Sequence, residues 1–162
     1  MESIQTEPFH NVETVLETYG NLLFRICFIM LGNEIDAEDA VQETLIKYVQ
    51  KKPVFRDAEH EKAWLLTVAG NQCKDMLRFK KKHSWVELEK ISEAVNIPSD
   101  SGILEALMTL PEKYKMVLML YYVEGYPIEE IAKIIGRTKS AVKMRLQKGR
   151  KLLKVVYKKD YM

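Results

Sequence analysis

The residues best suited to chemistry lie in the last quarter of the chain, where cations gather without acids. Residues 137–159 hold ten Lys or Arg and no Asp or Glu. Lysine and arginine neutralise phosphates, and amide or hydroxyl side chains among them can bond the edges of bases. This composition therefore predicts contact with a nucleic acid. The alternative is a solvated basic helix on an ordinary helical protein, because charge runs are commonly just exposed faces.

Wound as a helix at 100° per residue, this segment separates into two faces. Val142, Leu146 and Leu153 form a narrow apolar stripe that would bury against the rest of the domain. Gln147 could bond adenine bidentately, and Met144 could pack on a thymine methyl group. The opposite face and its flanks hold the residues expected to contact DNA: Lys139, Ser140, Lys143, Met144, Arg145, Gln147, Lys148 and Arg150.

The preceding residues predict that this helix is the second of a helix-turn-helix pair. Pro127 suits the start of a helix, and apolar residues recur on one face of residues 128–135. Gly136 supplies a sharp stop, after which Thr138 can cap the next helix. A helix opened by Pro111 would support the pair. A basic second helix in this arrangement favours a DNA-binding domain.

The N-terminal part of the chain has the opposite charge. Residues 1–60 carry five Lys or Arg against eleven Asp or Glu, whereas residues 106–162 carry thirteen against five. Such an asymmetry suggests two kinds of partner. The basic end suits phosphate, and the acidic end suits a protein.

Helical periodicity predicts a first helix over residues 12–31, ended by Gly32, and a second over residues 36–50, capped by Asp36. The second helix has an acidic outer face around one exposed aliphatic residue, a common composition for a protein docking site. A plain solvated face explains the same pattern equally well. The residues concerned are Asp39, Gln42, Glu43 and Ile46.

A third helix is predicted over residues 57–82, with aromatic, amide and basic side chains together. Bases stack on rings and cations follow a phosphate backbone, so this mixture suits single-stranded nucleic acid. Trp64 and the preceding Phe55 could instead belong to the core, where such rings are more common. The polar members are Asn71 and a basic end that includes Arg78, Lys80 and Lys81.

The helical pattern and the turns predict an all-α protein of two small helical domains joined by a flexible linker. That linker is placed over residues 84–102, between domains at 1–83 and 103–162, because residues 96–102 are turn-rich and only a short helix is expected before them, around residues 86–95. Cys27 and Cys73 lack metal-ligand spacing and are expected to be core thiols in a reducing compartment. We expect no metal, cofactor or catalytic triad. With no leader pattern and apolar runs too short for a bilayer, the sequence predicts a cytoplasmic protein without membrane insertion.

From residue 19 to residue 153 the chain resembles the sigma factors of bacterial RNA polymerase, specifically the small two-domain extracytoplasmic-function class. The first half resembles sigma region 2 and the second half resembles region 4. Both resemblances occur in the family's order and at its separation. The motifs are residues 36–44, Phe55-Arg56, Ala63-Trp64-Leu65, Asn71, residues 75–78, residues 110–114 and residues 128–150.

The resemblance implies roles for the candidate residues. Asp39, Gln42, Glu43 and Ile46 would dock on the β′ coiled coil of core polymerase, and region 4 would meet the β flap. Residues 63–78 would melt the minus-10 element, with Phe55, Val68 and Asn71 around a flipped base and Trp64, Arg78, Lys80 and Lys81 nearby. The basic recognition helix would read the minus-35 element. Members of this class are commonly held inactive by an anti-sigma factor, often anchored in the membrane.

Two other functions remain compatible with the residues. A stand-alone helix-turn-helix regulator would bind duplex DNA by itself, typically as a dimer. A helical adaptor would use its basic C-terminus to bind an acidic protein, and sequence-selective DNA binding that falls steeply with salt would argue against it.

Overall fold

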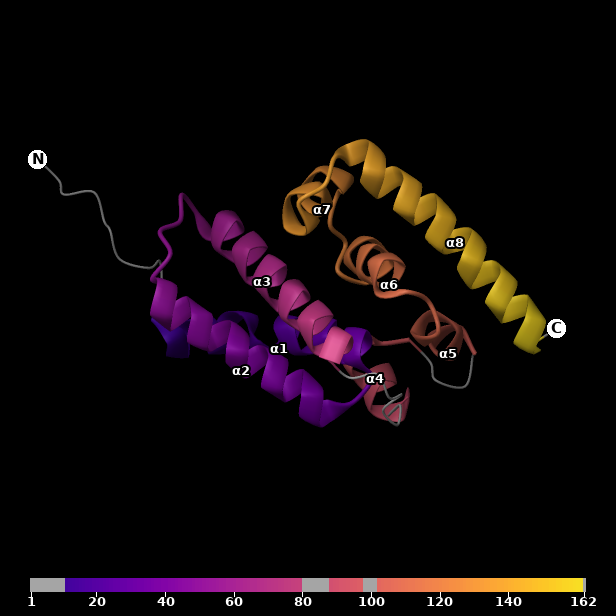
Figure 1. Ribbon diagram of the computed structural model, residues 1–162, viewed down its shortest axis with the longest axis horizontal. Coiled ribbons are helices and arrows are strands. Elements are labelled where there is room, and N and C mark those ends of the chain that lie inside the picture. Colours follow the sequence, from indigo (N-terminus) through magenta and orange to yellow (C-terminus); the bar gives the residue numbers. More distant parts are fainter. Residues whose placement is uncertain (1–10, 80–87, 98–101, 162) are drawn as a thin grey trace, which may run out of the picture.

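The computed structural model describes residues 11–79, 88–97 and 102–161, and these residues form helices and connecting turns (Figure 1). The N-terminal helices are α1 (Val12–Leu31), α2 (Glu34–Lys51) and α3 (Ala58–Phe79). They pack against one another pairwise. The predicted all-α fold is confirmed, with no strand in the part of the chain that the structure describes.

The core of this N-terminal bundle combines aliphatic and aromatic side chains. Leu23 and Ile26 of α1 and Leu65 of α3 are completely buried. Tyr48 of α2 is also buried, and its hydroxyl donates to Glu61 Oε2 over 2.8 Å. A buried carboxylate without any donor would cost several kcal/mol, so this bond contributes to the burial of Glu61 in the core.

Local signals set the junction between α1 and α2. Gly32 ends α1 in the left-handed region, with φ 82°. Asn33, not Asp36 as predicted, caps α2: Asn33 Oδ1 accepts from the Asp36 backbone N–H at 2.9 Å. Asp36 lies one turn into the helix, where its carboxylate accepts from the Asn33 amide at 2.9 Å. Asn33 thus accepts from the backbone of Asp36 and donates to its side chain, so the two residues stabilise the start of α2 together.

The C-terminal half contains α5 (Ile103–Met108), α6 (Glu112–Leu118), a π-helical turn η2 (Met119–Val123), α7 (Ile128–Ile135) and α8 (Lys139–Tyr161). Pro111 and Pro127 each stand directly before a helix, at the N-cap position. Gly136 ends α7 with φ 67°. The predicted helix, turn and second helix are therefore present.

A further helix, α4 (Leu88–Val95), lies inside the segment predicted as a linker. It packs on α1 and α5, and its Ile91 is fully buried. Most other residues of that segment lie outside the described residues, as do the candidate DNA contacts Lys80 and Lys81. The segment thus contributes a helix to the core.

The two halves pack directly on each other through α3 with α7 and α1 with α6. Arg25 of α1 forms a two-pronged ion pair with Glu124, with its Nε and Nη2 at 3.0 and 2.9 Å from the two carboxylate oxygens. The Lys115 ammonium of α6 donates to the backbone carbonyls of Ile29 and Met30 at 3.2 and 3.3 Å. We call this set of contacts the interdomain interface.

Two more contacts extend the interdomain interface along α3. The Thr67 hydroxyl donates to the Ile134 carbonyl near the end of α7. One turn earlier, the Lys62 ammonium stands 4.7 Å from the centroid of the Tyr126 ring. Two polar contacts thus reinforce the packing of α3 on the C-terminal half.

Helix α1 is the one described helix whose length and apolar composition would also suit a membrane span, which corrects the expectation that no run was long enough. More than half of that stretch is buried inside the protein. The core helix of a helical bundle has the same composition, and α1 packs on α2, α3, α4 and α6.

Both cysteines are buried and unpaired, as expected for core thiols. A hydrogen bond with Cys27 and burial raise the pKa of the Cys73 thiol. Among the described residues no three His, Cys, Asp or Glu side chains gather as a metal site would require.

Candidate nucleic-acid interface

Helix α8 is held by its apolar stripe and presents the other face outward. Thr138 caps it, with its hydroxyl accepting from the Ala141 backbone N–H at 3.1 Å. Val142 and Leu146 are buried, whereas the Met144 side chain is 69% exposed. At Gly149, an added Cβ would lie 3.3 Å from a Leu118 methyl, so the absent side chain lets α8 approach α6 closely.

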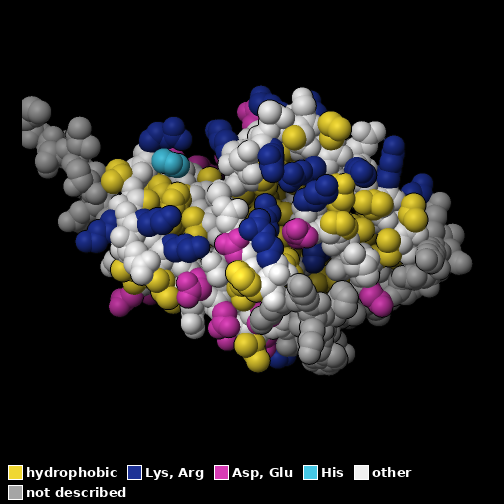
Figure 2. Space-filling model, viewed as in Figure 1, with side chains coloured by type: hydrophobic (Ala, Val, Ile, Leu, Met, Phe, Trp, Pro, Cys, Tyr) yellow, Lys and Arg dark blue, Asp and Glu magenta, His cyan; other side chains and the backbone are white. Residues whose placement is uncertain are grey.

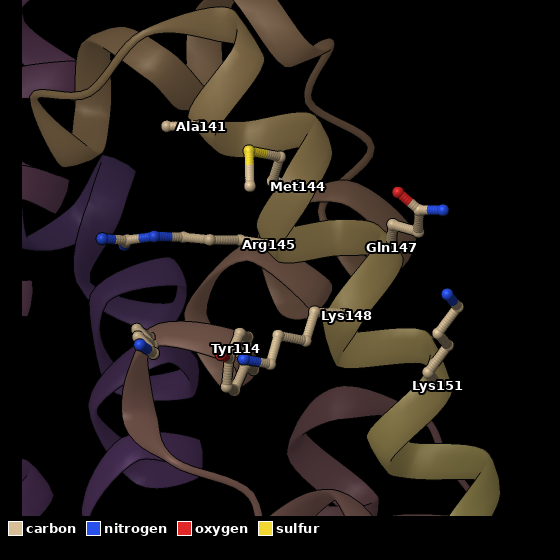
Figure 3. A pocket seen from close by; sticks show the side chains of 8 residues that line it. Tyr114, Ala141, Met144, Arg145, Gln147, Lys148 and Lys151 are labelled. Atoms are coloured by element: carbon tan, nitrogen blue, oxygen red, sulfur yellow. The ribbon is translucent and has the colours of Figure 1, made fainter.

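The exposed face of α8 borders a cleft of about 600 Å³ shared with α6. Figure 3 shows Arg145 extending to one side of α8 and Gln147 to the other. Among its lining residues are four cations and no acid, which gives the cleft a positive potential suited to phosphate. The lining residues are Lys113, Tyr114, Ala141, Met144, Arg145, Gln147, Lys148 and Lys151.

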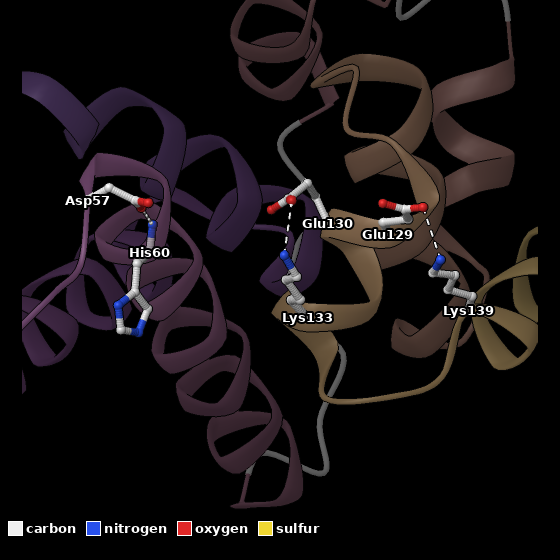
Figure 4. Close-up of polar contacts among 6 residues, drawn as sticks. All are labelled: Asp57, His60, Glu129, Glu130, Lys133 and Lys139. Carbon is white, nitrogen blue, oxygen red and sulfur yellow. Dashed lines mark hydrogen bonds and ion pairs between the residues drawn. The ribbon is translucent and has the colours of Figure 1, made fainter.

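Four of the eight predicted minus-35 residues line this cleft, namely Met144, Arg145, Gln147 and Lys148. Ser140 and Lys143 are exposed on α8 outside it. The other two are held by side chains of neighbouring elements. Lys139 pairs with Glu129 of α7 at 2.9 Å (Figure 4), and Arg150 donates to the Tyr122 hydroxyl at 3.0 Å.

Sequence reasoning missed Lys113 and Tyr114 as members of this site. Lys113 and Tyr114 follow Pro111, which opens α6, so only the packing of α6 on α8 brings them to the cleft. Lys151 lies seven residues after Met144 and thus on the same helical face. The helical wheel of the sequence places Lys151 on that face, although it is not among the residues expected to contact DNA.

Dark blue side chains gather where α6, α7 and the start of α8 meet (Figure 2). The cationic cleft described above belongs to this patch. A basic patch of this kind is the electrostatic footprint expected of a nucleic-acid-binding surface.

The second candidate surface lies on α3 and the loop before it. Trp64 and Val68 are half-buried, while Asn71 and Arg78 are exposed. Arg78 also pairs with Asp75 at 3.3 Å. These positions recur every three to four residues and therefore share one side of α3.

Phe55 takes part in an aromatic cluster beneath that surface. Its side chain is 8% exposed, and its ring lies 6.1 Å from Tyr48, 5.9 Å from Trp64 and 5.3 Å from His60 between centroids. These separations are within the range of favourable ring pairs. Phe55 thus fills the core in this conformation, as the alternative interpretation of the sequence expected.

A hollow of about 410 Å³ separates this aromatic cluster from α7. His60 lies on its α3 side, and the His60 backbone N–H donates to Asp57 Oδ1 at 2.8 Å (Figure 4). Glu130 and Lys133 close it from α7, where they form an ion pair 3.5 Å long. The hollow therefore carries charges of both signs, unlike the cleft on α8.

On α2, the side chains of Asp39, Gln42 and Glu43 are exposed, and that of Ile46 is 44% exposed. Gln42 also lines a groove of about 560 Å³ between α2 and α1. Apolar side chains of both helices, including the half-exposed Leu16, form the floor of this groove. The four side chains thus form an exposed face of α2, and the apolar groove lies next to it.

The sequence matches two protein-family descriptions in the order expected. Residues 15–83 match Sigma-70 region 2, and residues 101–153 match Sigma-70, region 4. Among curated proteins it is 31% identical to the RNA polymerase sigma factor SigV of Bacillus subtilis, with 91% of each chain covered. It is 25% identical to the ECF RNA polymerase sigma factor SigW of the same organism, over 86% of this chain and 85% of the relative.

Solved structures with the same fold include two that hold a second protein. The sigma factor RpoE of Bartonella quintana, crystallised with the anti-sigma factor NepR, is 25% identical with a TM-score of 0.68, covering 90% of this chain and 96% of that one. CnrH in complex with the cytosolic domain of CnrY is 20% identical with a TM-score of 0.69, covering 92% and 88%. Both likenesses extend across the two halves of the chain.

Proposed function

This chain belongs to the sigma-70 family, in the extracytoplasmic-function class of RNA polymerase sigma factors, and from that premise we propose how its residues direct transcription initiation. It binds core RNA polymerase and promoter DNA and acts as an initiation factor. The observation that carries the proposal is the geometry of α8, whose apolar stripe is buried while its reading face borders a cleft with four cations.

In this proposal α8 enters the major groove of the minus-35 element. Met144 and Gln147 lie in the middle of the exposed face and meet base edges, while Arg145 and Lys148 meet phosphates. Region 4 also meets the β flap of core polymerase. Met144 is exposed and lies outside the interdomain interface. In this proposal α8 can therefore read the duplex while the two halves stay packed.

The minus-10 element is assigned to α3. Asn71 and Arg78 are exposed and can meet an unpaired strand, with Trp64 and Val68 beside them and Lys80 and Lys81 beyond the described end of α3. Trp64 is half-buried, so the exposed part of its ring is available for a base to stack on. Holding a base against Phe55 would require the cluster to rearrange, since its neighbours cover that ring.

The docking of core polymerase is assigned to α2. Its exposed acids Asp39 and Glu43 flank Gln42 and Ile46, and such a face suits a basic helical surface like the β′ coiled coil. The chain performs no catalysis of its own in this proposal. It acts in the cytoplasm, with polymerase carrying out the chemistry.

Control by an anti-sigma factor is part of the proposal. It is supported by the likeness to RpoE, whose solved structure contains the anti-sigma factor NepR. The apolar groove between α1 and α2 adjoins the polymerase-docking face and shares Gln42 with it. An inhibitor bound there would exclude core polymerase by occupying the same side of α2.

The experiment that tests the proposed function is in vitro transcription with sigma-free core polymerase on a pooled library of promoter fragments. We expect defined transcripts only when the protein is added. Their start sites would yield the minus-10 and minus-35 elements together. Tight duplex binding by the protein alone, with no transcript, would instead indicate a stand-alone helix-turn-helix regulator.

The docking face has its own test. The double variant Asp39→Lys with Glu43→Lys should weaken binding to core polymerase, because it reverses two charges on the docking face. Glu93→Lys on α4 is a matched control, since Glu93 is an exposed acid outside that face. Equal weakening by the control would attribute the loss to overall charge and refute the assignment of α2.

A further inference from the structure

The cationic cleft is built from two helices, with Lys113 of α6 facing α8. The Lys113 ammonium stands 5.0 Å from the centroid of the Tyr114 ring, within the range of a cation–π contact. Tyr114 is itself buried, at 5% exposure, and therefore offers a fixed platform. Lys113 is thus held beside Arg145 and Lys148, which line the same cleft.

The opposite flank of α8 has a cation held by a different element. Lys143 and Arg150 are seven residues apart and share a side of α8, roughly opposite Arg145 and Lys148 on a 100° helical wheel. The Arg150 guanidinium donates to the Tyr122 hydroxyl at 3.0 Å. An arginine held in this way loses less side-chain entropy when it binds a phosphate.

Tyr122 reaches α8 because the chain makes a π-helical turn at η2. In this turn the Glu124 backbone N–H donates to the Met119 carbonyl, five residues earlier. The extra residue shifts the register between α6 and the segment that follows. Tyr122 then faces Arg150, while Glu124 faces Arg25 across the interdomain interface. Such π turns recur at functional sites.

We propose that α6 and η2 hold the two strands of the DNA backbone on either side of α8. Lys113 binds a phosphate on one side, and Tyr122 positions Arg150 for a phosphate on the other. A helix in the major groove has a phosphate backbone along each wall, so cations are needed on both flanks. This inference rests on the proposed reading of duplex DNA by α8 and adds contacts from outside that helix.

The first test measures the salt dependence of binding to a duplex that carries the minus-35 element, with the full-length chain. Lys113→Ala should lower the slope of log affinity against log salt by about 0.9, the value of one phosphate contact. Between about 50 and about 200 mM salt, the wild type should therefore lose about 3.5-fold more affinity than the variant. Base preference should be unchanged, because a phosphate carries no sequence information.

Lys51→Ala is the matched control, because it removes the same charge from an exposed position on α2. Its slope should equal that of the wild type. A wild-type slope for Lys113→Ala, or an equal decrease for Lys51→Ala, would overturn the role of Lys113.

The second test isolates the positioning role of Tyr122. Tyr122→Phe keeps the ring and removes the hydroxyl, so it should weaken duplex binding about threefold when Arg150 is present. In an Arg150→Ala background the same change should have no effect, because the hydroxyl then has nothing to hold. Tyr121→Phe, at the exposed neighbouring position, should be neutral in both backgrounds.

Additive effects of Tyr122→Phe and Arg150→Ala, or no effect of either, would refute the positioning role. These outcomes are distinct from failure of the proposed function. If wild-type protein directs transcription with core polymerase while Lys113→Ala keeps the full slope, only the present inference is wrong. If the wild type neither directs transcription nor prefers the minus-35 duplex, both are wrong.

Discussion

The buried ammonium of Lys115 predicts that this protein becomes more stable as the pH rises above neutrality. Lys115 is 7% exposed and lies in the interdomain interface, where it donates to the last carbonyls of α1. Burial lowers the pKa of Lys115 from 10.5 to about 8, although Glu112 and Cys73 act to raise it. The carbonyls it meets are the negative end of the α1 dipole, which offsets part of the cost.

The direction of this pH dependence follows from the number of protons bound in the folded and unfolded states. Between pH 8 and 10.5 the unfolded chain keeps a proton on Lys115 that the folded protein has released. Because the unfolded state binds more protons there, the free energy of unfolding rises with pH. The full difference is about 3 kcal/mol, of which about 2 kcal/mol falls between pH 7 and pH 9.5.

The assay is denaturant unfolding of the wild type and of Lys115→Met at several pH values. The difference in unfolding free energy, wild type minus variant, should grow by about 2 kcal/mol from pH 7 to pH 9.5. Tyr19 opposes this trend at higher pH, because burial and Glu61 raise the pKa of its hydroxyl to about 12. The stability that the protonated Tyr19 hydroxyl contributes is therefore lost as the pH rises above 10. Tyr19 is present in both proteins, and its contribution cancels in the difference.

Lys113→Met, on the same helix but exposed, serves as the control, because it removes an ammonium group from the surface and not from the core. A difference for Lys115→Met that changes with pH no more than that of the control would refute the reasoning. If Lys115→Met does not fold, the wild-type curve below pH 8.5 still tests the prediction, because the raised pKa of the Cys73 thiol lowers stability only at higher pH. A wild type with no gain in stability from pH 7 to pH 8.5 would then contradict the predicted titration.

Further predictions concern the recognition helix and the packing of the halves. Gln147→Ala should reduce discrimination among minus-35 variants by about 1–3 kcal/mol in competition binding, and unchanged discrimination would remove Gln147 as a reader. Glu124→Gln should cost about 1–3 kcal/mol in denaturant unfolding, because it leaves Arg25 without its charged partner; an equal cost in an Arg25→Gln background would show that the pair is not coupled. Gly149→Leu should lower the melting temperature by several degrees, since its side chain would overlap Leu118. An unchanged melting temperature would mean that α8 can move away from α6 at little cost.

Local signals predicted the helices well. Gly32, Gly136 and Thr138 act where expected because left-handed glycine and hydroxyl capping are decided by a few neighbouring residues. The cap of α2 was placed three residues late, at Asp36, because Asn33 and Asp36 are both good capping residues. Sequence alone does not distinguish them when each bonds the other.

The parts that could not be predicted depend on long-range packing. The ion pair of Arg25 with Glu124 joins residues 99 apart in sequence, and no periodicity indicates such a contact. The π turn at η2 has no distinctive residue, yet it turns Tyr122 toward α8. For the same reason the candidate site was predicted as one face of a helix, without the contribution of Lys113.

The interdomain interface also limits how far apart the two proposed DNA-reading helices can lie. Helix α7 packs on both α3 and α8, so the two proposed DNA-reading helices are separated by two packing steps of about 10 Å each. Promoter elements named for positions 10 and 35 lie about 25 base pairs apart, or about 85 Å along B-form DNA. A spacing of about 20 Å between the two helices is far shorter than that length. Reading a whole promoter therefore requires α3 and α7 to part, and the bonds of Arg25, Thr67 and Lys115 across the interdomain interface set the work of that opening.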